Sequence, residues 1–106
     1  MTAGRFVIAY DASKLPVAEE VLTAFIKNNK HVLQWSKIFP GAYLVKSESD
    51  ARDITNSLDD LMVRCNFIVV KIFKTGGNNW NGRLPKDVWS WFAESVDDES
   101  QVLGLE

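Results

Sequence analysis

Cysteine and histidine are scarce in this chain of 106 residues, which contains one of each, Cys65 and His31. A single cysteine excludes an internal disulfide, a cysteine-based zinc site and a Cys-x-x-Cys redox motif. One cysteine and one histidine also exclude a His/Cys metal site within one chain. A Ser-His-Asp or Cys-His pair would have to use His31, whose neighbours are typical of the start of a strand. We therefore expect no such triad.

Long apolar runs and an excess of positive charge are also absent. No apolar stretch reaches the roughly 18 residues of a membrane-spanning helix, and the N-terminus has no signal-peptide pattern. We therefore expect a cytoplasmic protein without a membrane partner. Lysine and arginine number 12 against 14 aspartates and glutamates, which gives a net charge of -2. This balance does not favour tight, sequence-independent binding to a nucleic-acid duplex.

The composition, 46% hydrophobic and 25% charged, is typical of one soluble globular domain. We predict one domain over residues 1–92, followed by an acidic, mobile tail over residues 93–106. Within the domain, four apolar runs rich in branched and aromatic residues predict strands. They cover residues 5–10, 31–37, 42–46 and 66–73.

Two amphipathic stretches separate these runs and predict helices. The first opens at Pro16 and ends at Asn28-Asn29. The second follows the segment Ser47-Glu48-Ser49-Asp50, which offers two possible N-caps and in which Ser47 and Asp50 resemble a capping box. The apolar stripe of the first helix consists of Val17, Val21, Ala24 and Phe25. The stripe of the second consists of Ala51, Ile54, Leu58, Leu61 and Met62.

The resulting order, β-α-β-β-α-β, predicts an α+β fold of ferredoxin-like type, an antiparallel sheet with both helices on one face. A short tryptophan-rich helix over residues 86–92 follows as a C-terminal extension. Its large aromatic side chains, together with Trp80, are suited to covering the sheet or to packing across a dimer partner. The alternative is a small cluster within one protomer. The residues concerned are Trp80, Trp89, Trp91 and Phe92.

Three short motifs on this topology resemble a known family. The first strand ends in Tyr10-Asp11, the second leads through Trp35-Ser36 to the hairpin, and residues 80–91 read Trp-Asn-Gly-Arg-Leu-Pro-Lys-Asp-Val-Trp-Ser-Trp. Together they resemble the Cas2-like small proteins, which comprise CRISPR-associated Cas2 and its relatives, and among these the SinR-like group. The resemblance covers roughly residues 5 to 92.

This resemblance implies a bacterial homodimer of ferredoxin-like protomers in which a strand-end aspartate from each protomer faces the two-fold axis. In Cas2-type nucleases that pair holds one divalent metal. Asp11 is the matching residue, so the resemblance implies Asp11 as catalytic residue and as ligand for Mg²⁺ or Mn²⁺, acting on RNA or DNA phosphodiesters. The chain departs from the family because no arginine lies between His31 and Tyr43 and because its net charge is acidic.

Elementary chemistry leaves two interpretations of Asp11 open. Mg²⁺ prefers carboxylate oxygens and often uses only one or two from the protein, so a two-fold axis could supply the second. Such an ion would polarise a phosphate and acidify a bound water. The alternative is that Asp11 ends the strand and, with Ser13, accepts hydrogen bonds within a turn.

Residues near the hairpin turn, Ser36, Lys37 and Phe39, are candidates for contact with a phosphate or a base. The alternative is an edge hairpin whose lysine discourages aggregation. Tyr10 and Trp35 are expected in a core or an interface rather than in a base-stacking platform. Two functions follow from the sequence. One is a metal-dependent nuclease, and the other is a non-catalytic dimeric interaction or regulatory protein, such as a component of a toxin–antitoxin-like pair.

Overall fold

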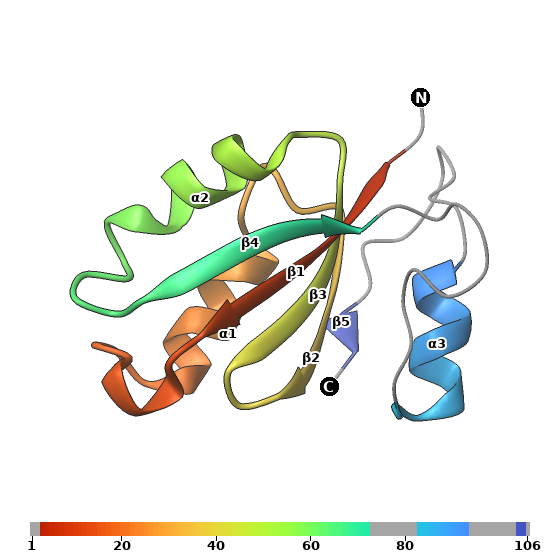
Figure 1. The fold of residues 1–106 in the computed structure, drawn as a ribbon, viewed down its shortest axis with the longest axis horizontal. Coiled ribbons are helices and arrows are strands. Elements are labelled where there is room, and N and C mark those ends of the chain that lie inside the picture. The colour runs from red at the N-terminus through yellow and green to blue at the C-terminus, as the bar shows by residue number, and fades with distance from the viewer. Residues whose placement is uncertain (1–2, 73–82, 94–103, 106) are drawn as a thin grey trace.

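The computed structural model describes residues 3–72 and 83–93 and the backbone of residues 104–105. In chain order the elements are β1 (Gly4–Tyr10), the short 3-10 helix η1 (Ala12–Lys14), α1 (Glu19–Lys27), β2 (Gln34–Phe39), β3 (Ala42–Ser47), α2 (Ala51–Asp59), β4 (Phe67–Ile72), α3 (Lys86–Ala93) and β5 (Gly104–Leu105). Figure 1 shows the sheet with α1 and α2 at one side and α3 at the other.

The sheet has the strand order β4-β1-β3-β2-β5. β1 is antiparallel to both β3 and β4, and β2 is antiparallel to β3. β5 adds a two-residue parallel pairing at the outer edge of β2. The predicted α+β architecture with a four-stranded antiparallel sheet is therefore confirmed.

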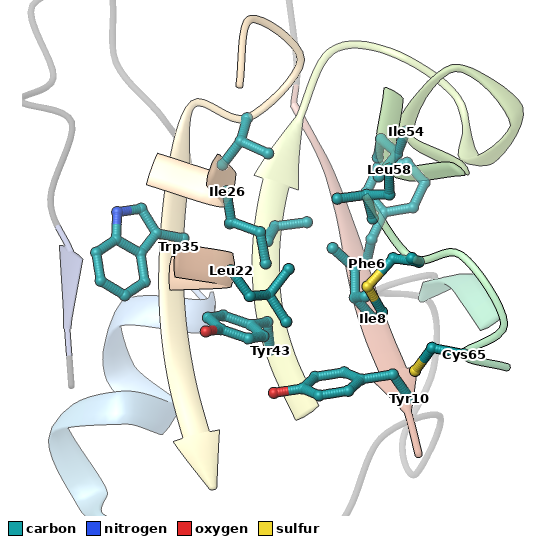
Figure 2. Close-up of a cluster of buried hydrophobic side chains, with 13 residues drawn as sticks. Phe6, Ile8, Tyr10, Leu22, Ile26, Trp35, Tyr43, Ile54, Leu58 and Cys65 are labelled. Atoms are coloured by element: carbon teal, nitrogen blue, oxygen red, sulfur yellow. The ribbon is translucent and has the colours of Figure 1, made fainter. Parts of the chain in front are cut away.

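The first face of the sheet carries the main core, as the alternation of side chains along β1 requires. Phe6 and Ile8 are completely buried there, and α1 and α2 pack over them. Figure 2 shows these side chains converging between the strands and the two helices. The helical contribution comes from Leu22, Ile26, Ile54 and Leu58.

The buried stripe of α1 differs from the predicted one. The helix begins at Glu19, because Ala18 is extended at the N-cap, so Val17 lies outside the helix. Leu22 and Ile26, four residues apart, face the core, whereas Val21 is 48% exposed. The predicted stripe was wrong because it assumed that the helix begins at Pro16, whereas the helix begins three residues later, at Glu19.

The N-cap of α2 lies within the predicted segment from Ser47 to Asp50, but it is not the Ser47 of the predicted capping box. Asp50 caps the helix, and its side chain accepts a hydrogen bond from the Asp53 backbone N–H at 2.8 Å. Ser47 instead ends β3, and its hydroxyl accepts from the Ser49 N–H at 2.9 Å. The predicted apolar stripe of α2 is confirmed for Ile54 and Leu58, which are buried on the helix. The helix ends at Asp59, so Met62 is buried in the turn that follows it.

The hairpin between β2 and β3 forms where Pro40-Gly41 predicted it. Gly41 has φ 101°, a left-handed conformation that glycine adopts without strain, and an added Cβ would lie 3.2 Å from the Tyr10 carbonyl oxygen. β2 begins at Gln34 rather than at residue 31. The Asn29 side chain accepts from the His31 N–H at 2.9 Å and holds the preceding residues in a turn.

The second face of the sheet is partly covered by α3. Val88, Trp91 and Phe92 pack on Leu44, with half-buried apolar residues of β1, β2 and β4 around them. Trp80 and residues 94–103 of the predicted mobile tail lie outside the described residues, whereas Ala93 ends α3. Among the residues that the structure describes, no helix is long and apolar enough to cross a membrane.

Candidate functional site

Asp11 lies at the end of β1 and is exposed. It is the N-cap of η1, and its carboxylate accepts hydrogen bonds from the Ser13 N–H at 3.1 Å and the Ser13 hydroxyl at 2.6 Å. The Asp11 N–H donates to the Asn66 carbonyl at 3.1 Å, and the thiol of buried Cys65 donates to the Asp11 carbonyl at 3.3 Å. These contacts match the interpretation of Asp11 as a turn residue and fix its position beside β4.

The described residues form no cluster of metal ligands around Asp11. In the described part of the chain, no group of three or more histidine, cysteine, aspartate or glutamate side chains could hold a metal ion. A shallow cavity of about 370 Å³ adjoins Asp11. It is lined by Ala9, Tyr10, Asp11, Asn66, Phe67 and Ile68.

The three hairpin residues are not brought together. Ser36 is 1% exposed and follows Trp35 in β2, whose side chain lies in the core of the first face, so Ser36 belongs to the second face. Lys37 forms an ion pair with Glu19 of α1 at 3.2 Å, and Phe39 is 54% exposed at the hairpin end. A common contact of all three with one phosphate or base is therefore sterically unfavourable in this conformation.

Tyr10 is buried and contacts polar groups of α1. Its hydroxyl donates to Glu19 Oε1 at 2.7 Å, the same oxygen that pairs with Lys37. Burial raises the pKa of the Tyr10 hydroxyl, and the hydrogen bond to Glu19 raises it further. The ring stacks on Tyr43 with centroids 6.2 Å apart. Tyr10 is thus a core residue with a polar end rather than a base-stacking platform.

His31 contacts Ser49, with Nδ1 and the hydroxyl oxygen 2.7 Å apart. No described carboxylate forms an ion pair with the ring, so the orienting acid of a catalytic triad is missing from this part of the chain. The contact ties the turn before β2 to the loop before α2.

The second face contains polar residues that sequence reasoning missed. Arg5 is 8% exposed, and its guanidinium donates to the carbonyls of Phe92 at 2.5 Å and Ala93 at 2.7 Å. Lys46 is 1% exposed and donates to the Trp91 carbonyl at 2.5 Å, with its ammonium 4.8 Å from the Trp91 ring. Burial lowers the pKa of Arg5.

A third polar contact completes this row. Gln34 is the register partner of Lys46, and its side-chain oxygen accepts from Trp91 Nε1 at 2.9 Å. The three polar residues therefore hold the last turn of α3 on the sheet. The sequence did contain one signal, the alternation of side chains along a strand. Arg5 lies two residues from Val7, and Lys46 lies two residues from Leu44, so both point to the second face.

Comparison of the chain with known families gives no matching family model, and comparisons with curated proteins and with solved structures give no match either. The family assignment thus rests on the sequence motifs alone and stays a prediction.

Proposed function

We propose that the protein is a homodimer that acts as a non-catalytic interaction protein, with protomers joined along β4. The observation that carries this proposal is the exposure of Ile68 and Val70, at 57% and 43%, on the terminal strand of the sheet. Both side chains belong to the second face, beyond the area that α3 covers. An exposed, mostly apolar edge strand is a template for pairing with another chain.

Symmetry supports a second copy as the partner. Two β4 strands that pair antiparallel about a two-fold axis perpendicular to the sheet keep α1 and α2 of both protomers on one side. A pairing centred on Val70 brings Ile68 opposite Ile72 of the other copy. A pairing centred on Val69 brings Ile68 opposite Val70. In both registers apolar side chains of the second face meet apolar side chains.

The finer fold assignment belongs to the same proposal. The order β4-β1-β3-β2, with α1 and α2 as crossovers on one face, supports a ferredoxin-like βαββαβ protomer. Together with the Tyr10-Asp11 and tryptophan motifs, this order supports a Cas2-like, SinR-like relationship.

A metal-dependent nuclease is the second candidate, favoured by the position of Asp11 in the same shallow cavity as Ile68. If the second faces of two protomers packed face to face over Ile68, two Asp11 carboxylates would approach and could share Mg²⁺ or Mn²⁺. Edge pairing through β4 separates them instead. The two arrangements therefore exclude each other, and RNA or DNA cleavage belongs only to the face-to-face arrangement.

The test compares two equally simple substitutions by light scattering coupled to size exclusion. Val70→Asp puts a charge at the proposed interface and is expected to convert the dimer into a monomer. Val63→Asp is the matched control, because Val63 is 54% exposed after α2 and lies outside the sheet. A monomeric wild-type protein, or dimers that persist in the Val70→Asp variant, would refute the proposed interface.

A further inference from the structure

A groove of about 650 Å³ runs between α1 and β2, apart from Asp11 and from the exposed strip of β4. It combines one aromatic ring with charges of both signs. Its lining consists of Glu19, Glu20, Thr23, Ala24, Lys27, Trp35 and Lys37.

Trp35 contributes an unused hydrogen-bond donor to this groove. The residue is 2% exposed, and its ring N–H has no hydrogen-bond partner among the described residues. Figure 2 shows the ring at the margin of the core cluster, with its nitrogen turned away from Tyr43. A buried N–H without an acceptor is destabilising, so an acceptor brought by a ligand would relieve that cost.

The charges of the groove are distributed unevenly. Lys37 is paired with Glu19 and lies at the N-terminal end of α1. Lys27 lies in the last turn of the helix and forms no ion pair within the described residues. Since Thr23 and Lys27 are four residues apart, they share one helix face. The Trp35 donor and the Lys27 cation thus suit an anionic acceptor.

The outer edge of β2 already pairs with extended backbone. In the parallel pairing with β5, Trp35 is opposite Gly104 and Ser36 is opposite Leu105. A residue opposite Trp35 would direct its side chain to the groove side of the sheet. Gly104 has no side chain, so the chain's own strand leaves the Trp35 donor without an acceptor.

We propose that this edge and groove form a binding site for an extended acidic peptide. The peptide displaces β5 and pairs with β2 in its place, as extended peptides add to the edges of sheets. Its glutamate or aspartate side chain, opposite Trp35, accepts from Trp35 Nε1 and lies near the ammonium of Lys27. This site is independent of the proposed dimer edge, because β2 and β4 lie on opposite sides of the sheet.

The test follows the indole N–H signal of Trp35 by NMR in the full chain, with the signal assigned from a Trp35→Phe variant. Two peptides are titrated, acetyl-Thr-Val-Glu-Val-Thr-amide and the same sequence with glutamine in place of glutamate. The glutamate peptide is expected to move the signal and to bind roughly tenfold more tightly, as a hydrogen bond to a charged group implies. Lys27→Gln should remove that preference, and Lys14→Gln, on η1, should retain it.

A second arm needs no added peptide. Gly104→Glu places a carboxylate opposite Trp35 within the chain and is expected to move the same indole signal in the same direction. A Trp35 signal unchanged in both arms would overturn the proposal, as would equal affinity for the two peptides.

Discussion

Arg5 of β1 and Lys46 of β3 lie directly opposite each other in the sheet, and both donate hydrogen bonds to carbonyls in the last turn of α3. The C-terminal end of a helix carries partial negative charge on such carbonyls, so cations there are stabilising. Two like charges in register would otherwise repel each other. The carbonyls at the end of α3 thus offset the repulsion between Arg5 and Lys46. In return, the hydrogen bonds from these two side chains hold the helix on the sheet.

Replacement of Lys46 tests this relationship. Lys46→Met keeps most of the aliphatic volume but leaves the buried Trp91 carbonyl without this donor. We expect the free energy of unfolding to fall by about 1–3 kcal/mol in urea denaturation. Lys37→Met is the matched control, because its ion pair with Glu19 is partly solvated and is worth at most about 1 kcal/mol. Equal losses in the two variants would contradict the proposed role of Lys46.

The two tryptophans of α3 are expected to contribute unequally to stability. Trp91 is 6% exposed and donates to Gln34, whereas Trp89 is half-buried. Trp91→Ala should therefore cost about 3–5 kcal/mol in the free energy of unfolding, as for other buried large aromatic side chains. Trp89→Ala should cost clearly less in the same urea titration. The reverse order would mean that α3 presents its other side to the sheet.

We expect Tyr10 to make the free energy of unfolding decrease as the pH rises through the alkaline range. Burial and the hydrogen bond to Glu19 raise the pKa of its hydroxyl in the folded state above the ordinary value of about 10. Above about pH 10 the folded state thus holds a proton that the unfolded state has lost, so the free energy of unfolding falls as pH rises. Tyr10→Phe should flatten this decline in urea titrations between about pH 9 and 11. An identical pH slope in the variant would show that Tyr10 is not its source.

Asp11 is expected to act as a turn residue. Asp11→Asn removes the charge, and the proposed edge-paired dimer predicts that cleavage of RNA or DNA with Mg²⁺ or Mn²⁺ is absent before and after the change. Neither ion should raise the melting temperature of the wild-type protein, because one carboxylate per protomer gives no built site. A metal-dependent rise that Asp11→Asn abolishes would instead favour the nuclease.

The strands and the second helix could be predicted because their apolar patterns match the buried positions, as at Ile54 and Leu58 of α2. The buried face of α1 could not be predicted, because Ala18 is extended and the helix begins only at Glu19. The alternation of side chains assigns Arg5 and Lys46 to the second face, but their burial could not be predicted, because it depends on where α3 docks, through contacts 87 and 45 residues apart in the chain. The proposed metal role of Asp11 would depend on a second protomer, which the pattern of one chain does not describe.

The separation of the two Asp11 positions in the proposed dimer tests the central claim most directly. It can be measured by pulsed electron paramagnetic resonance between spin labels attached at Asp11→Cys, with buried Cys65 replaced by serine. In the pairings centred on Val69 and Val70, the two Asp11 residues lie six and eight residues apart along the strand direction. They also lie three strand spacings apart across the sheet, because β1 is next to β4 in each protomer. Together these offsets give a separation of about 25–30 Å. The account predicts a distance distribution in that range. Labels closer than about 15 Å, as sharing of one metal ion by two carboxylates requires, would contradict it.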